Sequence, residues 1–290
     1  MLKIFVDTDC DVTPEIANKY GFGLISMPYV EKENVIRPYE DWETYDPHAF
    51  YDKLRHGELA TTCALAPTDY IRYFEPYFEK GDDILYVHFS SAMTSTFNSM
   101  RLALDDLMER YPDRKFYACD TLCITIPALA IVERVGELAL KGASAEEIVE
   151  FVEKEKQHYA CYFFADDLKF FARSGRVSGI SAVMGNLLGI KPIININSAG
   201  KMGSIAKGKG RLKSIEKVLD YVEALQEDMK SYPVYVASTD CDGLAKKFIS
   251  VFTERFGDGF DIRLVPINPT AGAHCGPDST GIAFHAKSRE

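Results

Sequence analysis

Hydroxyl side chains gather directly after the apolar segment Ile84 to Phe89, just before a segment of helical period. Five fall within seven residues: Ser90, Ser91, Thr94, Ser95 and Thr96. At the start of a helix, free backbone N–H groups and the positive end of the helix dipole stabilise an anion. The turn is therefore predicted to hold a carboxylate or a phosphate, although helix capping alone also explains Ser and Thr at this place.

Two further segments could contribute polar groups to such a site. The segment ATTCALAPTDY carries Thr61, Thr62 and Thr68, and it is interpreted either as a loop that lines a pocket or as a turn before a helix. The final segment NPTAGAHCGPDSTG is rich in Gly and Pro, which leaves little room for a regular element. Its backbone is expected to approach a neighbouring group closely. His274 stands within it, either as a donor to an anion or as a structural side chain.

Arg173 and Arg176 precede the segment Ile180 to Ile190, which carries little charge. That segment is predicted to form a helix that is buried on most faces or lines an apolar cavity. A guanidinium beside such a cavity could pair with an acidic head group, and a structural salt bridge is the alternative.

The start of the chain supports an enzymatic alternative. An apolar strand ends in Asp7, Asp9 and Asp11, which resembles the D-x-D-x-T signature of haloacid-dehalogenase-like phosphatases. Asp7 would then be the nucleophile and Asp9 the acid/base, with Mg²⁺ neutralising both. That family has Thr or Val where this chain has Asp11.

A basic stretch runs from Lys201 to Lys217. Gly203 to Gly210 within it fits G-x-x-x-x-G-K, but Gly stands where a P-loop has its magnesium-binding Ser or Thr. An exposed basic loop, available to dock an acidic partner, explains the Gly and Lys content more simply.

Composition narrows the class of protein. The chain has 290 residues, 47% of them hydrophobic, which favours two domains. A net charge of −10 argues against a nucleic-acid partner. The start lacks the apolar run of a signal peptide and no segment is long and apolar enough to cross a bilayer, so a cytoplasmic protein is expected. Seven cysteines without a C-x-x-C pair predict reduced thiols.

Apolar runs alternate with amphipathic segments, which is typical of an α/β fold with parallel sheets. The expected strands are Lys3 to Asp7, Ile84 to Phe89, Lys115 to Cys119, Cys161 to Ala165, Pro192 to Asn197, Val234 to Ser238 and Ile262 to Ile267. The expected helices are Ser99 to Arg110, Pro127 to Lys141, Ala145 to His158, Leu212 to Met229 and Gly243 to Phe256. Ser144 and Glu147 form a predicted capping box.

Six segments, in order, resemble motifs of the DegV family of bacterial lipid-binding proteins. VDTDCDVTPE resembles the family's D-S-T-C-D-L opening, TTCALAPTDY its T-S-Q-P-S-P-x-D-F loop, and HFSSAMTSTFNS its H-I-S-S-x-L-S-G-T-Y-x-S segment. RSGRVS resembles G-G-R-I-S, LLGIKPI resembles L-L-x-I-K-P-I, and GAHCGPDSTG resembles T-H-x-G-P-G-A-L-G. The resemblance covers nearly the whole chain.

This resemblance implies two α/β domains with mostly parallel sheets and a long-chain fatty acid, such as palmitate, in a tunnel between them. By motif position, Thr62 and Thr94 hold the carboxylate, while His274 and Arg211 lie near the head group or a phosphorylated form of it. The chain would present the acid to a separate fatty acid kinase and would itself be neither an enzyme nor a cofactor protein. The remaining candidate ligand contacts are Ser91, Ser95, Arg173 and Arg176.

The predicted domains interleave. Residues 1–75 with part of 76–165 would supply the hydroxyl loops, and residues 166–290 would cover the acyl chain. The chain also departs from the family motifs, with Thr94 in place of Ser, Ser95 in place of Gly, and Cys63-Ala64-Leu65 in place of Ser-Gln-Pro. These changes predict a tighter and less polar head-group pocket. A third alternative is an interaction protein with a vestigial cavity.

Overall fold

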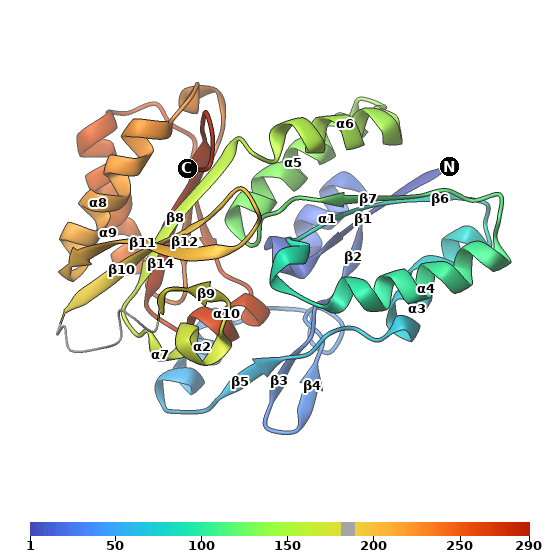
Figure 1. The fold of residues 1–290 in the computed structure, drawn as a ribbon, viewed down its shortest axis with the longest axis horizontal. Helices are drawn as coiled ribbons and strands as arrows, with labels where there is room; N and C mark the ends of the chain where they lie inside the picture. The colour runs from blue at the N-terminus through green and yellow to red at the C-terminus, as the bar shows by residue number, and fades with distance from the viewer. Residues whose placement is uncertain (181–188) are drawn as a thin grey trace.

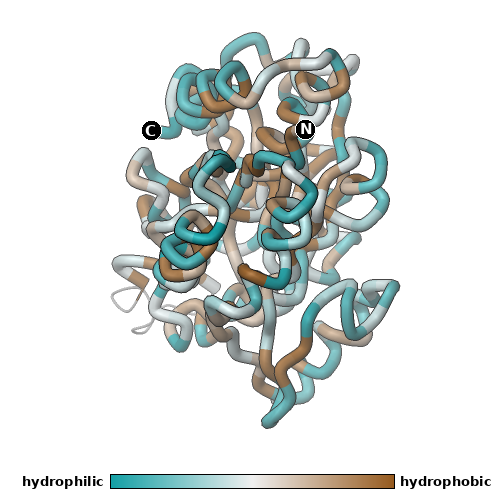
Figure 2. The backbone as a smooth tube through the Cα atoms, turned by 90° about the vertical axis from the view of Figure 1, so that its right-hand side faces the viewer, coloured by the Kyte–Doolittle hydropathy of each residue, from teal (hydrophilic) through white to brown (hydrophobic). Residues whose placement is uncertain are grey.

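The computed structural model describes residues 1–180 and 189–290. Two large sheets lie side by side with helices packed on them, and a small sheet lies below both in Figure 1. Many hydrophobic residues lie in the interior of the molecule, and hydrophilic residues are frequent on its outer helices and turns (Figure 2). Residues 181–188 lie outside the described part, so the predicted apolar helix over Ile180 to Ile190 stays a prediction. No helix in the described residues is long and apolar enough to span a membrane.

The first sheet is parallel throughout, as predicted, with the strand order β2-β1-β6-β7. The carboxyl ends of parallel strands meet at one edge of a sheet, where α/β proteins place their ligands. The turns that follow β1 and β6, which carry the aspartate run and the hydroxyl cluster, therefore lie at the same edge. The strands are β1 (Leu2–Asp7), β2 (Gly23–Ile25), β6 (Asp83–His88) and β7 (Phe116–Asp120).

The second sheet has the order β13-β12-β14-β8-β10-β11-β9, and here the prediction of mostly parallel sheets is wrong. Only the outer pairs β12–β13 and β9–β11 are parallel, whereas β14, β8 and β10 run antiparallel to their neighbours. The strands are β8 (Tyr159–Ala165), β9 (Val177–Ser178), β10 (Ile190–Ile196), β11 (Met202–Lys209), β12 (Val234–Ser238), β13 (Ile262–Pro266) and β14 (Ser279–His285).

Two strands of this sheet come from segments interpreted as loops. The basic stretch forms β11, which leads directly into a helix, so no phosphate-binding loop separates strand and helix there. The Gly-rich end of the chain forms a helix and then β14, whose residues are all buried. Gly281 pairs so closely with β8 that an added Cβ would lie 2.2 Å from Phe163 Cβ. The predicted close approach of this backbone is therefore made to protein, inside a strand.

A third, antiparallel sheet has the order β4-β3-β5 and packs against short helices. Helix α10 contacts β5, α2 and α7, which brings the end of the chain against its first quarter. The strands are β3 (Tyr29–Glu31), β4 (Asn34–Ile36) and β5 (Ala60–Thr62).

Helices α3, α6, α8 and α9 pack on the two large sheets, whereas α2 and α10 lie beside the small sheet. Helix α5 is buried on most of its faces and lies between the sheets, against β8, β12 and β14 on one side and the turn after β1 on the other (Figure 1). The predicted capping box starts α6, with Glu147 N donating to Ser144 Oγ and Ser144 N donating to Glu147 Oε2. The helices are α1 (Pro14–Tyr20), α2 (Pro47–Arg55), α3 (Pro67–Phe78), α4 (Thr96–Arg110), α5 (Ile126–Leu140), α6 (Ala145–Glu155), α7 (Lys169–Ser174), α8 (Gly210–Leu225), α9 (Asp242–Phe256) and α10 (Pro269–Cys275).

Candidate functional site

An apolar pocket lies where the three sheets approach one another. Its walls come from the turns after β1 and β6, from the start of α5, from α7 and α10, and from the inner face of the seven-stranded sheet. Most of its lining is hydrophobic and includes Phe89, Ile126, Phe163, Phe171, Ile196 and Ile267. Such a pocket is suited to an extended apolar ligand with a small polar group.

Thr62 and His274 form one polar corner of this pocket. Thr62 is the last residue of β5 and His274 lies in α10, and the packing of these two elements places Thr62 Oγ1 2.9 Å from His274 Nε2. The two residues are 212 positions apart in the sequence. Both line the pocket, so these two segments come together at one place in the fold.

Burial, reinforced by the positive charges of Arg176 and Arg173, lowers the pKa of His274 to about 4. The imidazole is therefore neutral near pH 7 and carries one ring proton. If that proton is on Nε2, it is donated to Thr62 Oγ1, and the Thr62 hydroxyl keeps its own hydrogen for a ligand. His274 can thus orient the hydroxyl without adding charge.

Thr94 supplies a second hydroxyl to the pocket. It stands between the single turn η2 (Ser91–Met93) and α4, and its Oγ1 accepts a hydrogen bond from Thr96 N at 3.1 Å. Because the oxygen accepts this bond, the Thr94 hydroxyl hydrogen remains available as a donor. Thr96 also lines the pocket, but its Oγ1 accepts from Leu65 N at 3.1 Å and bonds with the Tyr70 hydroxyl.

The comparisons with known proteins agree with this geometry. A family model described as "Uncharacterised protein, DegV family" matches residues 1–287. The chain belongs to the DegV family. A DegV domain-containing protein of Clostridium perfringens is 32% identical over 244 residues, which cover 84% of each chain.

Solved structures of low sequence identity share the DegV fold. A stearic-acid-binding protein of Eubacterium ventriosum has a TM-score of 0.86 at 18% identity, with 99% of each chain covered. The fatty acid kinase (Fak) B3 protein of Streptococcus pneumoniae, loaded with linoleic acid, has a TM-score of 0.81 at 20% identity, covering 99% of this chain and 100% of its own.

Two serines of the hydroxyl cluster after β6, Ser91 and Ser95, do not line the pocket. Ser91 is exposed and its hydroxyl and backbone N–H donate to Asp120, at the end of the neighbouring strand β7. Ser95 is exposed at the start of α4 and makes no capping hydrogen bond. Neither of these two serines lines the pocket. Ser91 bonds to the end of the neighbouring strand β7, and Ser95 is exposed to solvent.

The three predicted arginines have different surroundings. Arg176 lines the pocket from an exposed position after α7. Arg173 donates to the carbonyl oxygens of Ala60 at 3.0 Å and Ala273 at 3.3 Å, so it holds β5 against α10 and supports the Thr62–His274 pair. It does not line the pocket.

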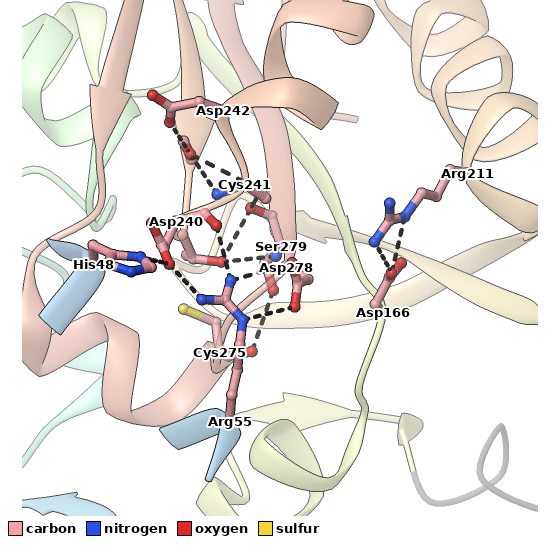
Figure 3. A network of polar contacts seen from close by, with 12 residues as sticks. His48, Arg55, Asp166, Arg211, Asp240, Cys241, Asp242, Cys275, Asp278 and Ser279 are labelled. Atoms are coloured by element: carbon pink, nitrogen blue, oxygen red, sulfur yellow. Dashed lines mark hydrogen bonds and ion pairs between the residues drawn. The ribbon is translucent and has the colours of Figure 1, made fainter. Parts of the chain in front are cut away.

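Arg211 is not among the residues that line the pocket, and it forms an ion pair with Asp166, with Nε 2.9 Å from Oδ2. Figure 3 shows this pair apart from the network in which Arg55 bonds to Asp240 and Asp278. The proximity of Arg211 to a head group stays a prediction.

The carboxylate of Asp7 is held by hydrogen bonds from the protein. Its Oδ1 accepts from Cys10 N at 3.2 Å, and its Oδ2 accepts from the Tyr86 hydroxyl at 2.9 Å and from Phe89 N at 3.1 Å. With three protein donors on its two oxygens, Asp7 is not free to act as the nucleophile that the phosphatase alternative requires.

Asp11 carries an ionisation cost that a single substitution should remove. Burial raises its pKa from 3.8 to about 7, although Asn268 donates two hydrogen bonds to Oδ1. A folded-state pKa above the unfolded value means that stability falls as pH rises from about 4 to 7. Asp11→Asn keeps the acceptor oxygen and suits the left-handed φ of 52°. It should raise the free energy of unfolding by roughly 1–3 kcal/mol at pH 8, and by much less at pH 5.

Urea unfolding at both pH values measures this gain. The exposed carboxyl of Asp258 gives the matched control Asp258→Asn, which should change little at either pH. An equal gain from Asp11→Asn at pH 8 and pH 5 would show that ionisation is not its cause.

Proposed function

We propose that this DegV protein binds one long-chain fatty acid in the apolar pocket, with its carboxylate accepting hydrogen bonds from Thr62 and Thr94. The observation that carries the proposal is the combination of an apolar lining with two hydroxyls that keep a hydrogen for a ligand. Relatives of the same fold are described as binding stearic and linoleic acids, which supports the same ligand class here.

The balance of energies favours this ligand. Burying about a dozen methylenes at roughly 0.8 kcal/mol each gives about 10 kcal/mol before association and ordering costs are subtracted. Two hydrogen bonds from hydroxyls then offset desolvation of the carboxylate. Arg176, exposed at the pocket edge, adds positive charge without being buried itself.

The protein would act as a carrier that presents the acid to a separate kinase. The likeness to a fatty acid kinase B3 protein motivates this part of the proposal. Within β11, Lys207 and Lys209 alternate with buried or half-buried residues and are both exposed, so they would offer positive charge to an acidic partner.

Native mass spectrometry of freshly purified protein, followed by solvent extraction, tests the proposal. The expected result is an adduct with the mass of one long-chain fatty acid, which exchanges for added palmitate. A denaturing spectrum of the same sample is the control, because a noncovalent ligand is lost there. Protein that is free of lipid and takes up neither palmitate nor oleate would refute the proposal.

A further inference from the structure

Among the hydroxyl and carboxyl side chains that line the pocket in the described residues, Thr62 and Thr94 keep a hydrogen for a ligand, and all but one of the others are satisfied by the protein. The hydroxyls of Thr125, Thr239, Thr270, Ser279 and Thr280 line the pocket. Each donates to a backbone carbonyl, at 2.7 Å for Thr125, 2.8 Å for Thr270 and Thr280, and 3.2 Å for Thr239 and Ser279. These groups hold the walls together and have no hydrogen left for a ligand.

Asp9 is the exception. It stands in the single turn η1 (Thr8–Cys10) after β1, lines the pocket, and is only 5% exposed. Its Oδ1 has no hydrogen-bond partner among the described residues. A buried carboxyl without a partner costs free energy, so one in a residue that lines a pocket indicates a polar group on the ligand.

The surroundings of Asp9 favour the neutral form of its carboxyl group. Burial first, and then the negative charges of Asp7 and Asp11, raise its pKa well above the ordinary value. In this form the side chain has both a donor and an acceptor. It therefore matches a partner that also donates and accepts, as an alcohol does.

Asp9 also reaches the pocket from a different part of the fold than the Thr62–His274 pair. It lines the pocket from η1, beside the start of α5, where Thr125 N donates to its backbone carbonyl at 2.7 Å, whereas Thr62 and His274 line it from β5 and α10. A ligand whose carboxylate is held by Thr62 and Thr94 would thus meet Asp9 along its chain. A saturated chain would leave the buried carboxyl unpartnered against methylene groups.

We infer that the preferred ligand is a hydroxylated fatty acid, whose chain hydroxyl hydrogen-bonds with Asp9 while Thr62 and Thr94 hold its carboxylate. This inference rests on the proposed function and names the class of acid that the same pocket selects. It also assigns the discrimination between hydroxylated and plain chains to one residue.

Competitive displacement of a fluorescent fatty acid from delipidated protein tests it. The competitors are stearate and a panel of monohydroxystearates with the hydroxyl near the middle or the end of the chain. At least one isomer should bind roughly tenfold more tightly than stearate, because it supplies the missing hydrogen bond. Asp9→Leu should abolish this preference and tighten stearate binding, whereas Asp9→Asn, which keeps a donor and an acceptor, should retain the preference.

The outcomes separate the inference from the function beneath it. Stearate binding with no isomer preferred by the wild-type protein, or a preference that survives Asp9→Leu, overturns the inference and leaves fatty acid binding intact. If neither stearate nor any isomer displaces the probe, the proposed function fails and the inference falls with it. Asp9→Ala, which removes the carboxyl without adding volume, replaces the leucine variant if that one does not fold.

Discussion

Replacing Thr62 and Thr94 together by valine should weaken palmitate binding by roughly a hundredfold. Valine keeps the shape of threonine but removes the two hydroxyls, and each hydrogen bond to a charged group contributes about 1.5–3 kcal/mol. Part of the loss would be recovered by water at this half-buried corner, so the lower end of the sum is expected. Isothermal titration of delipidated protein with palmitate measures the change.

Matched variants separate lost donors from lost shape. The Thr62→Ser, Thr94→Ser double variant keeps both hydroxyls and should bind within about threefold of wild type. Ser95→Ala removes an exposed hydroxyl of the same turn that does not line the pocket, and it should have no effect. Should the double valine variant still bind palmitate as tightly as wild type, the carboxylate would have to lie elsewhere in the pocket.

The parallel half of the fold could be predicted because its elements are strongly periodic. Ile84 to Val87 is an uninterrupted apolar run, which is what a strand buried on both faces requires, and it lies within β6. The predicted helices over Ser99 to Arg110 and Pro127 to Lys141 likewise match α4 and α5. Their apolar faces are wide enough for the helical period to be assigned without ambiguity.

The antiparallel half could be predicted only in part. Gly281 suggested a loop, yet in β14 the absence of a side chain is what lets Phe163 approach from the next strand. In β11 only Met202, Ile205 and Ala206 are apolar and they are not regularly spaced, so the apolar period of a strand is weak. Strand formation at both places depends on neighbours distant in sequence.

The same limit applies to the site. Thr62, Thr94, His274 and Arg176 were predicted from motifs, and all four line the pocket. The role of Asp9 as an unpartnered acid was not predicted, because it depends on which neighbouring hydroxyls find backbone acceptors. Most of these hydrogen bonds join residues that are far apart in the sequence, so local sequence cannot predict them.

Arg289 shows how strongly such distant pairings can contribute to stability. Its side chain is 1% exposed, and its guanidinium donates to the carbonyl oxygens of Leu122 at 2.6 Å and Thr121 at 2.9 Å. It also donates to the carbonyls of Asn197, at 3.2 Å, and Lys156. These carbonyls follow β7, β10 and α6, so one buried arginine ties together the ends of elements from both large sheets.

Arg289→Met should lower the free energy of unfolding by roughly 3–5 kcal/mol, since it leaves several buried carbonyls without donors. Urea titration measures the loss. Arg289→Lys keeps the charge and some of the donors, so its loss should be smaller, and Arg110→Met provides a control at a half-exposed arginine on the outer surface.

The two loops that Arg289 holds lead to Ile124 and from Ile196, which line the pocket. Palmitate affinity should therefore fall in Arg289→Met even where the protein is still folded, and an unchanged affinity would mean that the pocket wall keeps its position without this side chain.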